Sequence, residues 1–519
     1  MSLHRPLLCA LLLLAPGCAR QRAKPNILLI VVDTLRADHV GAQGERASLT
    51  PHIDAFATEC VVFSHAQSPR AKTTPAVSSL MTGLYPHDHG VRDLTTPLGG
   101  HVPVWAEVMK TGGYRTGAII GNFVLQAKLS GLARGFDMWI EDLPDAGGVP
   151  PSDVAMRRAT SMTDGVLCAL GLGEGSADGA GPARAFVRDG QPWFLWAHYM
   201  DPHGAYDPPA IQRQAALDNA DLGEIRVPQP EDPQLSDLHK RWVADYNITD
   251  ESRLADGSID AAHMRALYAG EVRYVDEQIG RLLDSLRSSG QLENTVVVIT
   301  ADHGESLGEH DYWFEHGRYA YEATCRVPMM IRFPESLHDQ PEVGVVHGDI
   351  ALADVWPTLT EVLWLPRGRA LGSHFSFVRG RSRASLLRGG TQQGAPVFCE
   401  KVERAEKARA VQSKAVRIGD WKFIRRYTHV VESRARENER KLLVLSEELY
   451  DLAQDPAEAN NLIRTPPSDA PMKALSSALL EFSQADEHFA QLARLLQMRR
   501  EELGREDPET LRALRALGY

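Results

Sequence analysis

Carboxylates and imidazoles follow three apolar segments of this sequence. Asp33 comes directly after ILLIVV, Asp302 and His303 come one residue after TVVVIT, and His203 lies four residues beyond FLWAHY. Carboxylate oxygens and imidazole nitrogens bind divalent metals, and imidazoles also transfer protons. Taken singly, each of these residues is more simply explained as a turn residue. Asp or His at the ends of three apolar segments together indicates a functional site.

A pair of hydroxyls could supply a nucleophile for the same site. Thr73 and Thr74 stand before Pro75 in AKTTPAVSSLMTG, residues 71–83. An alcohol needs help to attack at neutral pH, and coordination to a divalent metal gives that help by favouring the alkoxide. Pro75 is typical of the first turn of a helix over 76–81, and the start of that helix would favour an anionic sulfate or phosphate. The simpler alternative is that Thr74 caps the helix and Thr73 is a spacer, but a cap at Thr74 is compatible with metal ligation by Thr73.

The apolar runs themselves predict the elements that position these residues. They lack polar alternation, which suits parallel strands buried on both faces, and helical patterns such as 264–286 lie between them. We therefore expect an α/β fold with a large, mostly parallel sheet flanked by helices. Functional groups in such sheets gather at the carboxyl ends of the strands, where Asp33, His203 and Asp302 stand.

The chain is too long for a single core, and its character changes near residue 370. We predict a catalytic α/β domain over 24–370 and an α+β subdomain over 371–470, with a hairpin at 414–427 that turns at Gly419-Asp420 and a further strand at 442–452. A helical extension is expected over 471–519, a flexible loop over 171–184, and a surface insertion over 204–262.

Composition and the N-terminus limit the partners and the location. Lys and Arg number 56 against 68 Asp and Glu, a net charge of −12, which argues against a nucleic-acid partner.

Residues 1–18 combine a basic start with a short apolar run, which predicts a removable export signal. Cys18 follows small residues as in a bacterial lipoprotein, so we expect the protein in the periplasm or at the cell surface, with membrane attachment only through a lipid on Cys18. The alternative is ordinary cleavage near Ala19. The four later cysteines show no metal-ligand spacing and no evident pairing.

Many separated segments resemble the sulfatase family of the alkaline phosphatase superfamily. They include PNILLIVVDTLRADHVG, TTPAVSSLMTG with YPHDHGV, FLWAHYMDPHGAYDPP, ITADHGESLGEHDYW and EELYDLAQDPAEANNL, in family order from about residue 24 to about residue 465. The resemblance implies an alkaline-phosphatase-like fold and metal-binding positions at Asp33, Asp302 and His303. It also places Thr73 ten residues before Gly83, at the reactive position, where it would be both nucleophile and metal ligand.

The sequence departs from the family at that reactive position. Family sulfatases carry C/S-x-P-x-R and oxidise the Cys or Ser to formylglycine, whereas here Thr73 and Val77 replace the Cys or Ser and the Arg. Oxidation of a secondary alcohol would give a ketone, so no formylglycine is expected. Some superfamily members, including phosphodiesterases and phosphoethanolamine transferases, resemble this arrangement and use an unmodified Thr.

Other departures reduce the cationic groups that grip sulfate in the family. Thr34 replaces a second acid, GNF at 121–123 lacks the family's Lys and His, and His316 replaces a later Lys. We predict His203 and His316 as catalytic residues. His198 and His310 are weaker candidates, because a single His is more often structural.

Together these features predict an exported, metal-dependent hydrolase that cleaves a sulfate- or phosphate-type ester. One or two divalent ions (calcium, zinc or manganese) are expected, and the substrate would be a small-molecule or a glycan- or lipid-linked ester. A phosphorus ester is the favoured substrate. A formylglycine hydrate expels sulfate by collapsing to the aldehyde, whereas a covalent adduct on Thr cannot break down in this way. The alternatives are a phosphotransferase of the same superfamily and a non-catalytic binding protein that keeps the fold and the metal.

Overall fold

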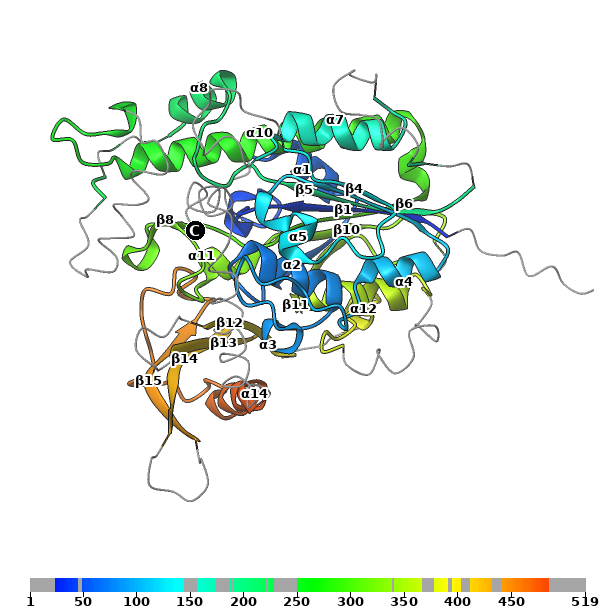
Figure 1. Cartoon of the computed structure of the whole chain (residues 1–519). Coiled ribbons are helices and arrows are strands. Elements are labelled where there is room, and N and C mark those ends of the chain that lie inside the picture. The colour runs from blue at the N-terminus through cyan, green and yellow to red at the C-terminus, as the bar shows by residue number, and fades with distance from the viewer. Residues whose placement is uncertain are drawn as a thin grey trace, which may run out of the picture.

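The N-terminal two thirds of the molecule form a large sheet flanked by helices (Figure 1). The computed structural model describes residues 24–44, 49–143, 156–173, 186–187, 190–220, 223, 225–227, 250–337, 340–365, 378–390, 394–402, 411–431 and 440–484. The predicted signal, Cys18, the domain boundary at 370, most of the loop over 171–184, much of the insertion over 204–262 and the end of the helical extension lie outside these residues.

The central sheet has nine strands, eight of them in the order β11-β2-β10-β6-β1-β5-β3-β4. Their bounds are β1 Asn26–Val32, β2 Val61–Gln67, β3 Arg115–Ile120, β4 Met138–Ile140, β5 Trp193–Tyr199, β6 Thr295–Ala301, β10 Met329–Arg332 and β11 Gly344–Ala351, with β9 Arg326–Val327 beside β2. β1 pairs in parallel with β5 and with β6, whereas β10 runs antiparallel to β2 and β6. The predicted α/β class with a mostly parallel sheet is confirmed.

Burial explains why the central strands lack polar alternation. Every residue of β5 and β6 is buried, and so is every residue of β1 except Asn26. Both faces are covered by helices: α10 (Ala261–Ser288), α7 (Ala159–Ala169) and α1 (Pro51–Ala57) lie on one side, and α2 (Thr73–Thr82), α4 (Trp105–Thr111) and α12 (Leu352–Val362) lie on the other (Figure 1). A sheet enclosed in this way leaves its functional groups at the strand ends.

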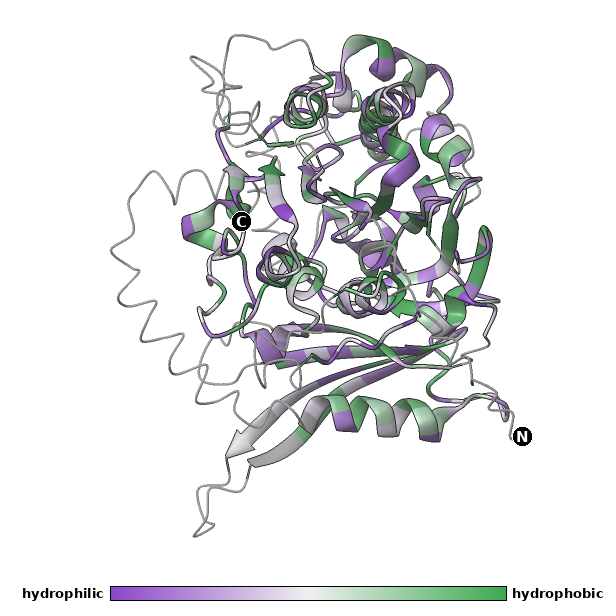
Figure 2. Ribbon diagram, turned by 90° about the vertical axis from the view of Figure 1, so that its right-hand side faces the viewer, coloured by the Kyte–Doolittle hydropathy of each residue, from purple (hydrophilic) through white to green (hydrophobic). Residues whose placement is uncertain are grey.

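A second, antiparallel sheet forms the C-terminal part. Its strand order is β12-β13-β14-β15, with β12 Val397–Val402, β13 Val411–Ile418, β14 Trp421–Val431 and β15 Arg440–Asp451. Ile418 pairs with Trp421 across Gly419-Asp420, so the predicted hairpin and its turn are confirmed. α14 (Met472–Gln484) lies along this sheet (Figure 2), and its Leu475 and Leu479 pack with Val416, Phe423 and Leu449.

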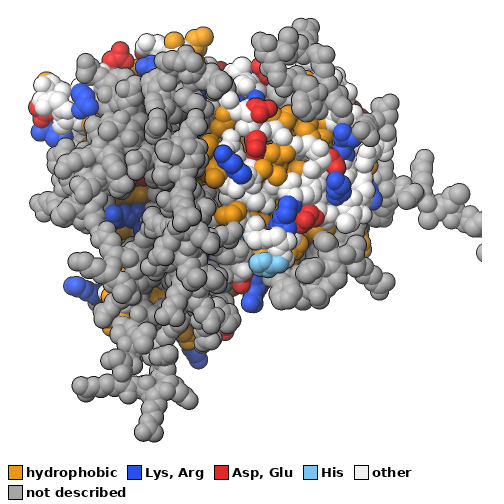
Figure 3. Space-filling model, viewed as in Figure 1, with side chains coloured by type: hydrophobic (Ala, Val, Ile, Leu, Met, Phe, Trp, Pro, Cys, Tyr) orange, Lys and Arg blue, Asp and Glu red, His pale blue; other side chains and the backbone are white. Residues whose placement is uncertain are grey.

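The surface carries charges of both signs. On the described part of the face in Figure 3, basic and acidic side chains are interspersed. Within the described part of the chain, no helix combines the length and the apolar character that a membrane span requires.

Candidate active site

Three buried side chains converge at the carboxyl edge of the central strands. Asp33 follows β1, Asp302 follows β6, and His198 is the penultimate residue of β5. One ligand atom from each lies within 4.8 Å of the others, and all three side chains are fully buried. The adjacent strands β6, β1 and β5 therefore bring two carboxylates and an imidazole to one point.

The polar atoms of this cluster fit a cation. Asp33 Oδ1, Asp302 Oδ2 and both ring nitrogens of His198 are buried without a hydrogen-bond partner among the described residues. Such groups are costly to bury unless something compensates them, and carboxylate and imidazole donors are what a divalent metal requires. Burial and the nearby Asp302 raise the pKa of Asp33, so without a cation this carboxylate is unfavourable in its charged form.

His303 belongs to the same cluster, as the sequence predicted. Its Nδ1 lies 3.0 Å from Gly304 O, so Nδ1–H donates to that carbonyl and Nε2 is left to face the cluster. Nε2 lies 3.6 Å from Asp33 Oδ1 and 3.5 Å from Asp302 Oδ2. This tautomer is the one that a metal-ligating Nε2 needs.

Thr73 points into the cluster from the start of α2. Its Oγ1 donates to Asp33 Oδ2 at 3.5 Å and lies 3.4 Å from His303 Nε2. The expected helix begins earlier than residue 76: Thr73 is its first residue, and Pro75 falls in the first turn, as predicted. The side chain is fully buried, so the hydroxyl has fixed neighbours before any ligand arrives.

The alternative that Thr74 caps this helix is wrong. The N-cap residue is Lys72, which makes no side-chain cap, and Thr74 lies inside the first turn. The Thr74 hydroxyl lies 3.1 Å from Leu94 O and 3.4 Å from Val124 O. Its hydrogen bonds go to these two backbone carbonyls and not to Asp33 or His303, which separates its role from that of Thr73.

Asn122 positions Asp33, and sequence reasoning missed it. Its Nδ2 donates to Asp33 Oδ2 at 2.7 Å, while its Oδ1 accepts a hydrogen bond from Val124 N at 3.0 Å. The sequence was interpreted there only as the loss of a Lys and a His. His198 was considered and not favoured, although an imidazole inside an otherwise apolar strand was a usable signal.

His203 and His316 lie beside the cluster. The ring centroid of His316 is 4.4 Å from that of His303 and 5.2 Å from that of His203. Burial lowers the pKa of His203 to about 4 and, together with Lys72, lowers that of His316 to about 3. Both rings are therefore neutral at pH 7 in the ligand-free protein.

Glu305 connects this group of histidines and was also missed. Its Oε1 lies 3.2 Å from His316 Nδ1, and burial raises its pKa to about 7. His310, in contrast, is not part of the site: its ring stacks on Tyr321 with the centroids 3.5 Å apart.

Lys72 is a cation that the sequence interpretation overlooked. It directly precedes Thr73, and its side chain lies against Gly317, where a Cβ would stand 2.6 Å from Lys72 Cε. Gly317 has φ +86°, so the absence of a side chain both permits this turn and leaves room for the lysine. The positive charge therefore lies next to His316, at the edge of the site.

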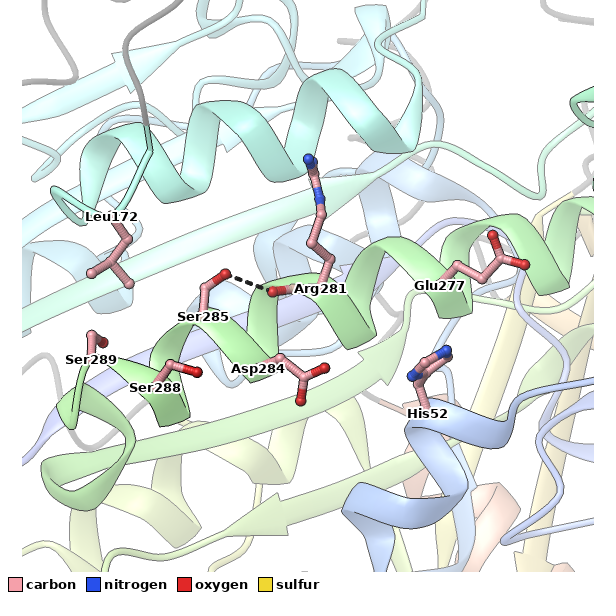
Figure 4. A pocket seen from close by; sticks show the side chains of 8 residues that line it. All are labelled: His52, Leu172, Glu277, Arg281, Asp284, Ser285, Ser288 and Ser289. Atoms are coloured by element: carbon pink, nitrogen blue, oxygen red, sulfur yellow. Dashed lines mark hydrogen bonds between the residues drawn. The ribbon is translucent and has the colours of Figure 1, made fainter.

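A hollow on the outer side of α10 is separate from this site. It has a volume of about 660 Å³ and is lined by His52, Glu277 and Arg281 among others (Figure 4). None of the residues of the buried cluster lines it.

Comparison with known proteins identifies the family. A model of the sulfatase family matches residues 25–363, and a model of the C-terminal region of N-sulphoglucosamine sulphohydrolase matches residues 308–485. The choline-sulfatase of Rhizobium meliloti (strain 1021) is 24% identical over 480 residues, which cover 85% of this chain and 83% of that protein. A multifunctional alkaline phosphatase superfamily protein of Trinickia caryophylli is 26% identical over 391 residues, 66% of this chain and 74% of that protein.

Solved structures agree on the fold. The phosphonate monoester hydrolase of Agrobacterium radiobacter superposes with a TM-score of 0.61 at 21% identity, over 90% of this chain and 96% of that one. Enzymes of the sulfatase family are metal-dependent, which agrees with the buried Asp33, His198 and Asp302. Because the family model extends from β1 through α12, well over half of the chain, this chain belongs to the sulfatase family of the alkaline phosphatase superfamily and is an ester hydrolase of that family.

Proposed function

We propose that this protein is an exported, metal-dependent hydrolase that cleaves phosphate- or sulfate-type esters with Thr73 as its nucleophile. The observation that carries the proposal is the position of Thr73 Oγ1, 3.5 Å from Asp33 Oδ2 and 3.4 Å from His303 Nε2. A hydroxyl at the start of a helix, next to buried and unsatisfied metal-type donors, is arranged for nucleophilic attack. Thr74, one residue further, has no such neighbours.

Asp33, His198, Asp302 and His303 are the residues that would hold the metal. A bound divalent cation would favour the ionised form of the Thr73 hydroxyl and stabilise negative charge on the transferring group. Two imidazoles among the donors suit zinc better than calcium or manganese, which prefer oxygen donors. Asn122 keeps Asp33 in place through its 2.7 Å hydrogen bond.

The remaining residues favour an anionic ester. Free N–H groups at the start of α2 and the charge of Lys72 attract negative oxygens. Thr73 Oγ1 would attack the phosphorus or sulfur in line with the leaving oxygen. We assign the proton for that oxygen to His203 or His316, whose ring centroids lie 5.2 Å apart beside the cluster. One of these rings would become protonated when the negative charge of a bound ester raises its pKa.

Phosphorus is the better candidate for the reacting centre. A covalent adduct on Thr73 has no internal route of collapse, so water or an acceptor alcohol must attack it, and a phosphoryl-type centre accommodates this second step. The relative in Trinickia caryophylli is a multifunctional member of the superfamily, which supports a site that accepts more than one ester class.

Purified protein loaded separately with zinc, manganese and calcium would be assayed against aryl sulfates, phosphate monoesters, phosphate diesters and phosphonates. We expect turnover of at least one phosphorus ester, and a phosphoryl-type label on Thr73 after acid quenching. Turnover of aryl sulfates alone would contradict the preference for phosphorus. Stoichiometric metal without turnover of any ester would contradict the hydrolase and favour a binding protein that keeps the fold and the metal.

A further inference from the structure

Two buried cysteines from distant parts of the chain are in direct contact. Cys325 is the last residue of α11 (Glu322–Cys325), and Cys399 lies in β12. Their sulfur atoms are 2.8 Å apart, and the two side chains are 0% and 2% exposed. Two sulfur atoms pack this closely only where little movement separates them from a covalent bond.

The surroundings of the pair exclude a metal and favour a cross-link. The sulfurs pack with Ala71, Ala415 and Ile424, and the buried charges of Arg70 and Lys422 lie near enough to act on the thiols. Among the described residues, no third His, Cys, Asp or Glu ligand atom joins these two sulfurs in a metal-type group. The chemistry that best accounts for two buried sulfurs in such close contact is the disulfide.

We propose that Cys325 and Cys399 form a disulfide in the mature protein, and that this bond fastens the C-terminal sheet to the loop that carries His303 and His316. Nothing in the cysteine spacing pointed to this pair, because 74 positions separate the two residues. The contact arises only when β12 lies beside the end of α11.

The chemistry is a two-step thiol–disulfide exchange. One cysteine thiolate attacks the disulfide of an oxidant, here oxidised glutathione, and releases one molecule of reduced glutathione. The second thiolate then displaces the other glutathione from the mixed disulfide. Overall, two S–H bonds are replaced by one S–S bond, and two electrons and two protons pass to the oxidant. Because the sulfurs end up buried, the exchange takes place during folding.

The cross-link would brace the segment that leads into Thr73. Ser68 N donates to Cys325 O at 2.7 Å, and Glu400 N, next to Cys399, donates to Pro69 O at 2.9 Å. Ser68 and Pro69 therefore link the backbone at Cys325 to the backbone next to Cys399. A bond between Cys325 and Cys399 fixes both sides of this segment at once.

Peptide mapping tests the bond directly. The full chain would be refolded with reduced and oxidised glutathione, denatured, alkylated with iodoacetamide without reductant, and digested. We expect the peptides of Cys325 and Cys399 to appear as one cross-linked species, two hydrogens lighter than their sum, with Cys60 and Cys168 alkylated. Alkylation of both Cys325 and Cys399 would overturn the proposal.

Thermal unfolding separates the bond from simple packing. Dithiothreitol should lower the Tm of the wild-type protein by about 4 °C and leave the Tm of Cys399→Ala unchanged. Cys60→Ala, which alters another buried cysteine, should keep the full response to dithiothreitol. An equal response in wild type and Cys399→Ala would also overturn the proposal. Neither experiment measures activity, so both are independent of the proposed reaction.

Discussion

Two adjacent hydroxyls at the start of α2 have different neighbours, because the helix turns about 100° from one residue to the next. Thr73 faces Asp33 and His303, whereas Thr74 faces the carbonyls of Leu94 and Val124. The direction of the side chain, and not the residue type, therefore distinguishes the proposed nucleophile Thr73 from the structural Thr74. It also supplies a matched pair of variants.

Thr73→Ala should lower turnover of the best ester substrate by at least about a thousandfold, because the attacking atom is removed. Metal content, measured by elemental analysis, should stay at the wild-type level, since the other donors remain. Thr74→Ala is the control: it loses a buried hydrogen bond, costs about 1 kcal/mol of stability and keeps most activity. Wild-type turnover by Thr73→Ala would show that water, and not Thr73, attacks.

His198→Ala should lose metal while keeping the fold, because the side chain has no hydrogen-bond partner to lose among the described residues. Elemental analysis and circular dichroism would measure the two properties. His310→Ala serves as the control, since its ring stacks on Tyr321 away from the cluster. Equal metal in both variants would remove His198 from the set of ligands.

Residues that follow apolar runs could be predicted from the sequence, whereas the roles of His198 and Asn122 depend on contacts that form only in the fold. Asp33, Asp302 and His303 follow apolar runs, so the strand-end rule found them. His198 lies inside β5 and looks like a core residue until β5 is placed beside β1, with β6 on the other side of β1. Asn122 acts only through its hydrogen bond to Asp33, a contact across 89 positions that no local pattern encodes.

At the scale of elements, the short helix α11 connects the site to the C-terminal sheet. Glu322, its first residue, lies 2.9 Å from Lys422 Nζ and 2.5 Å from Arg417 Nη1, on β14 and β13. All three side chains are buried. Such a network is costly to break because removing one partner leaves uncompensated charges.

Glu322→Gln should therefore destabilise the protein by about 3 kcal/mol at pH 7, measured by denaturant unfolding. Burial alone would raise the pKa of Glu322, but Lys422 and Arg417 outweigh it and hold the pKa below its ordinary value of 4.5. The stabilisation is thus present above pH 4.5 and is lost as the pH falls through the lower folded-state pKa, so the difference from wild type should shrink in acid.

Glu361→Gln is the control for that measurement. Glu361 pairs with Arg388 at 3.5 Å on the surface, where its loss should cost less than about 1 kcal/mol. A Glu322→Gln variant no less stable than Glu361→Gln would show that the buried network contributes nothing net.

Several elements could be predicted from periodicity, but sheet order could not. The apolar runs predicted β1, β5 and β6, and the turn at Gly419-Asp420 predicted the β13–β14 hairpin. The position of β10, antiparallel between β2 and β6, depends on pairings across the whole chain. Local hydrophobicity contains no information on such partners.

At the scale of the whole molecule, we propose export through residues 1–18 and lipid attachment at Cys18. Deleting residues 2–17 should keep the protein in the cytoplasm, and Cys18→Ser should move it from the detergent phase to the aqueous phase. Stable attachment requires more than one acyl chain, so partial modification should give intermediate partitioning. Cell fractionation and detergent partitioning measure the two effects. If wild type and Cys18→Ser both partition into water, the protein is secreted without an anchor.

The central position of β1 has a consequence for the order in which the molecule is built. Ile27 pairs with Phe194 on one side and with Val296 on the other. β1 therefore cannot complete its pairing until β5 and β6 have been synthesised. At about 5–20 residues per second, synthesis of the intervening chain takes roughly 15–60 s. Closing loops of that length makes assembly slow, and ILLIVV stays exposed to aggregation in the meantime. Until β6 has been made, the central sheet cannot close around β1, which would keep the chain unfolded for the export that we propose.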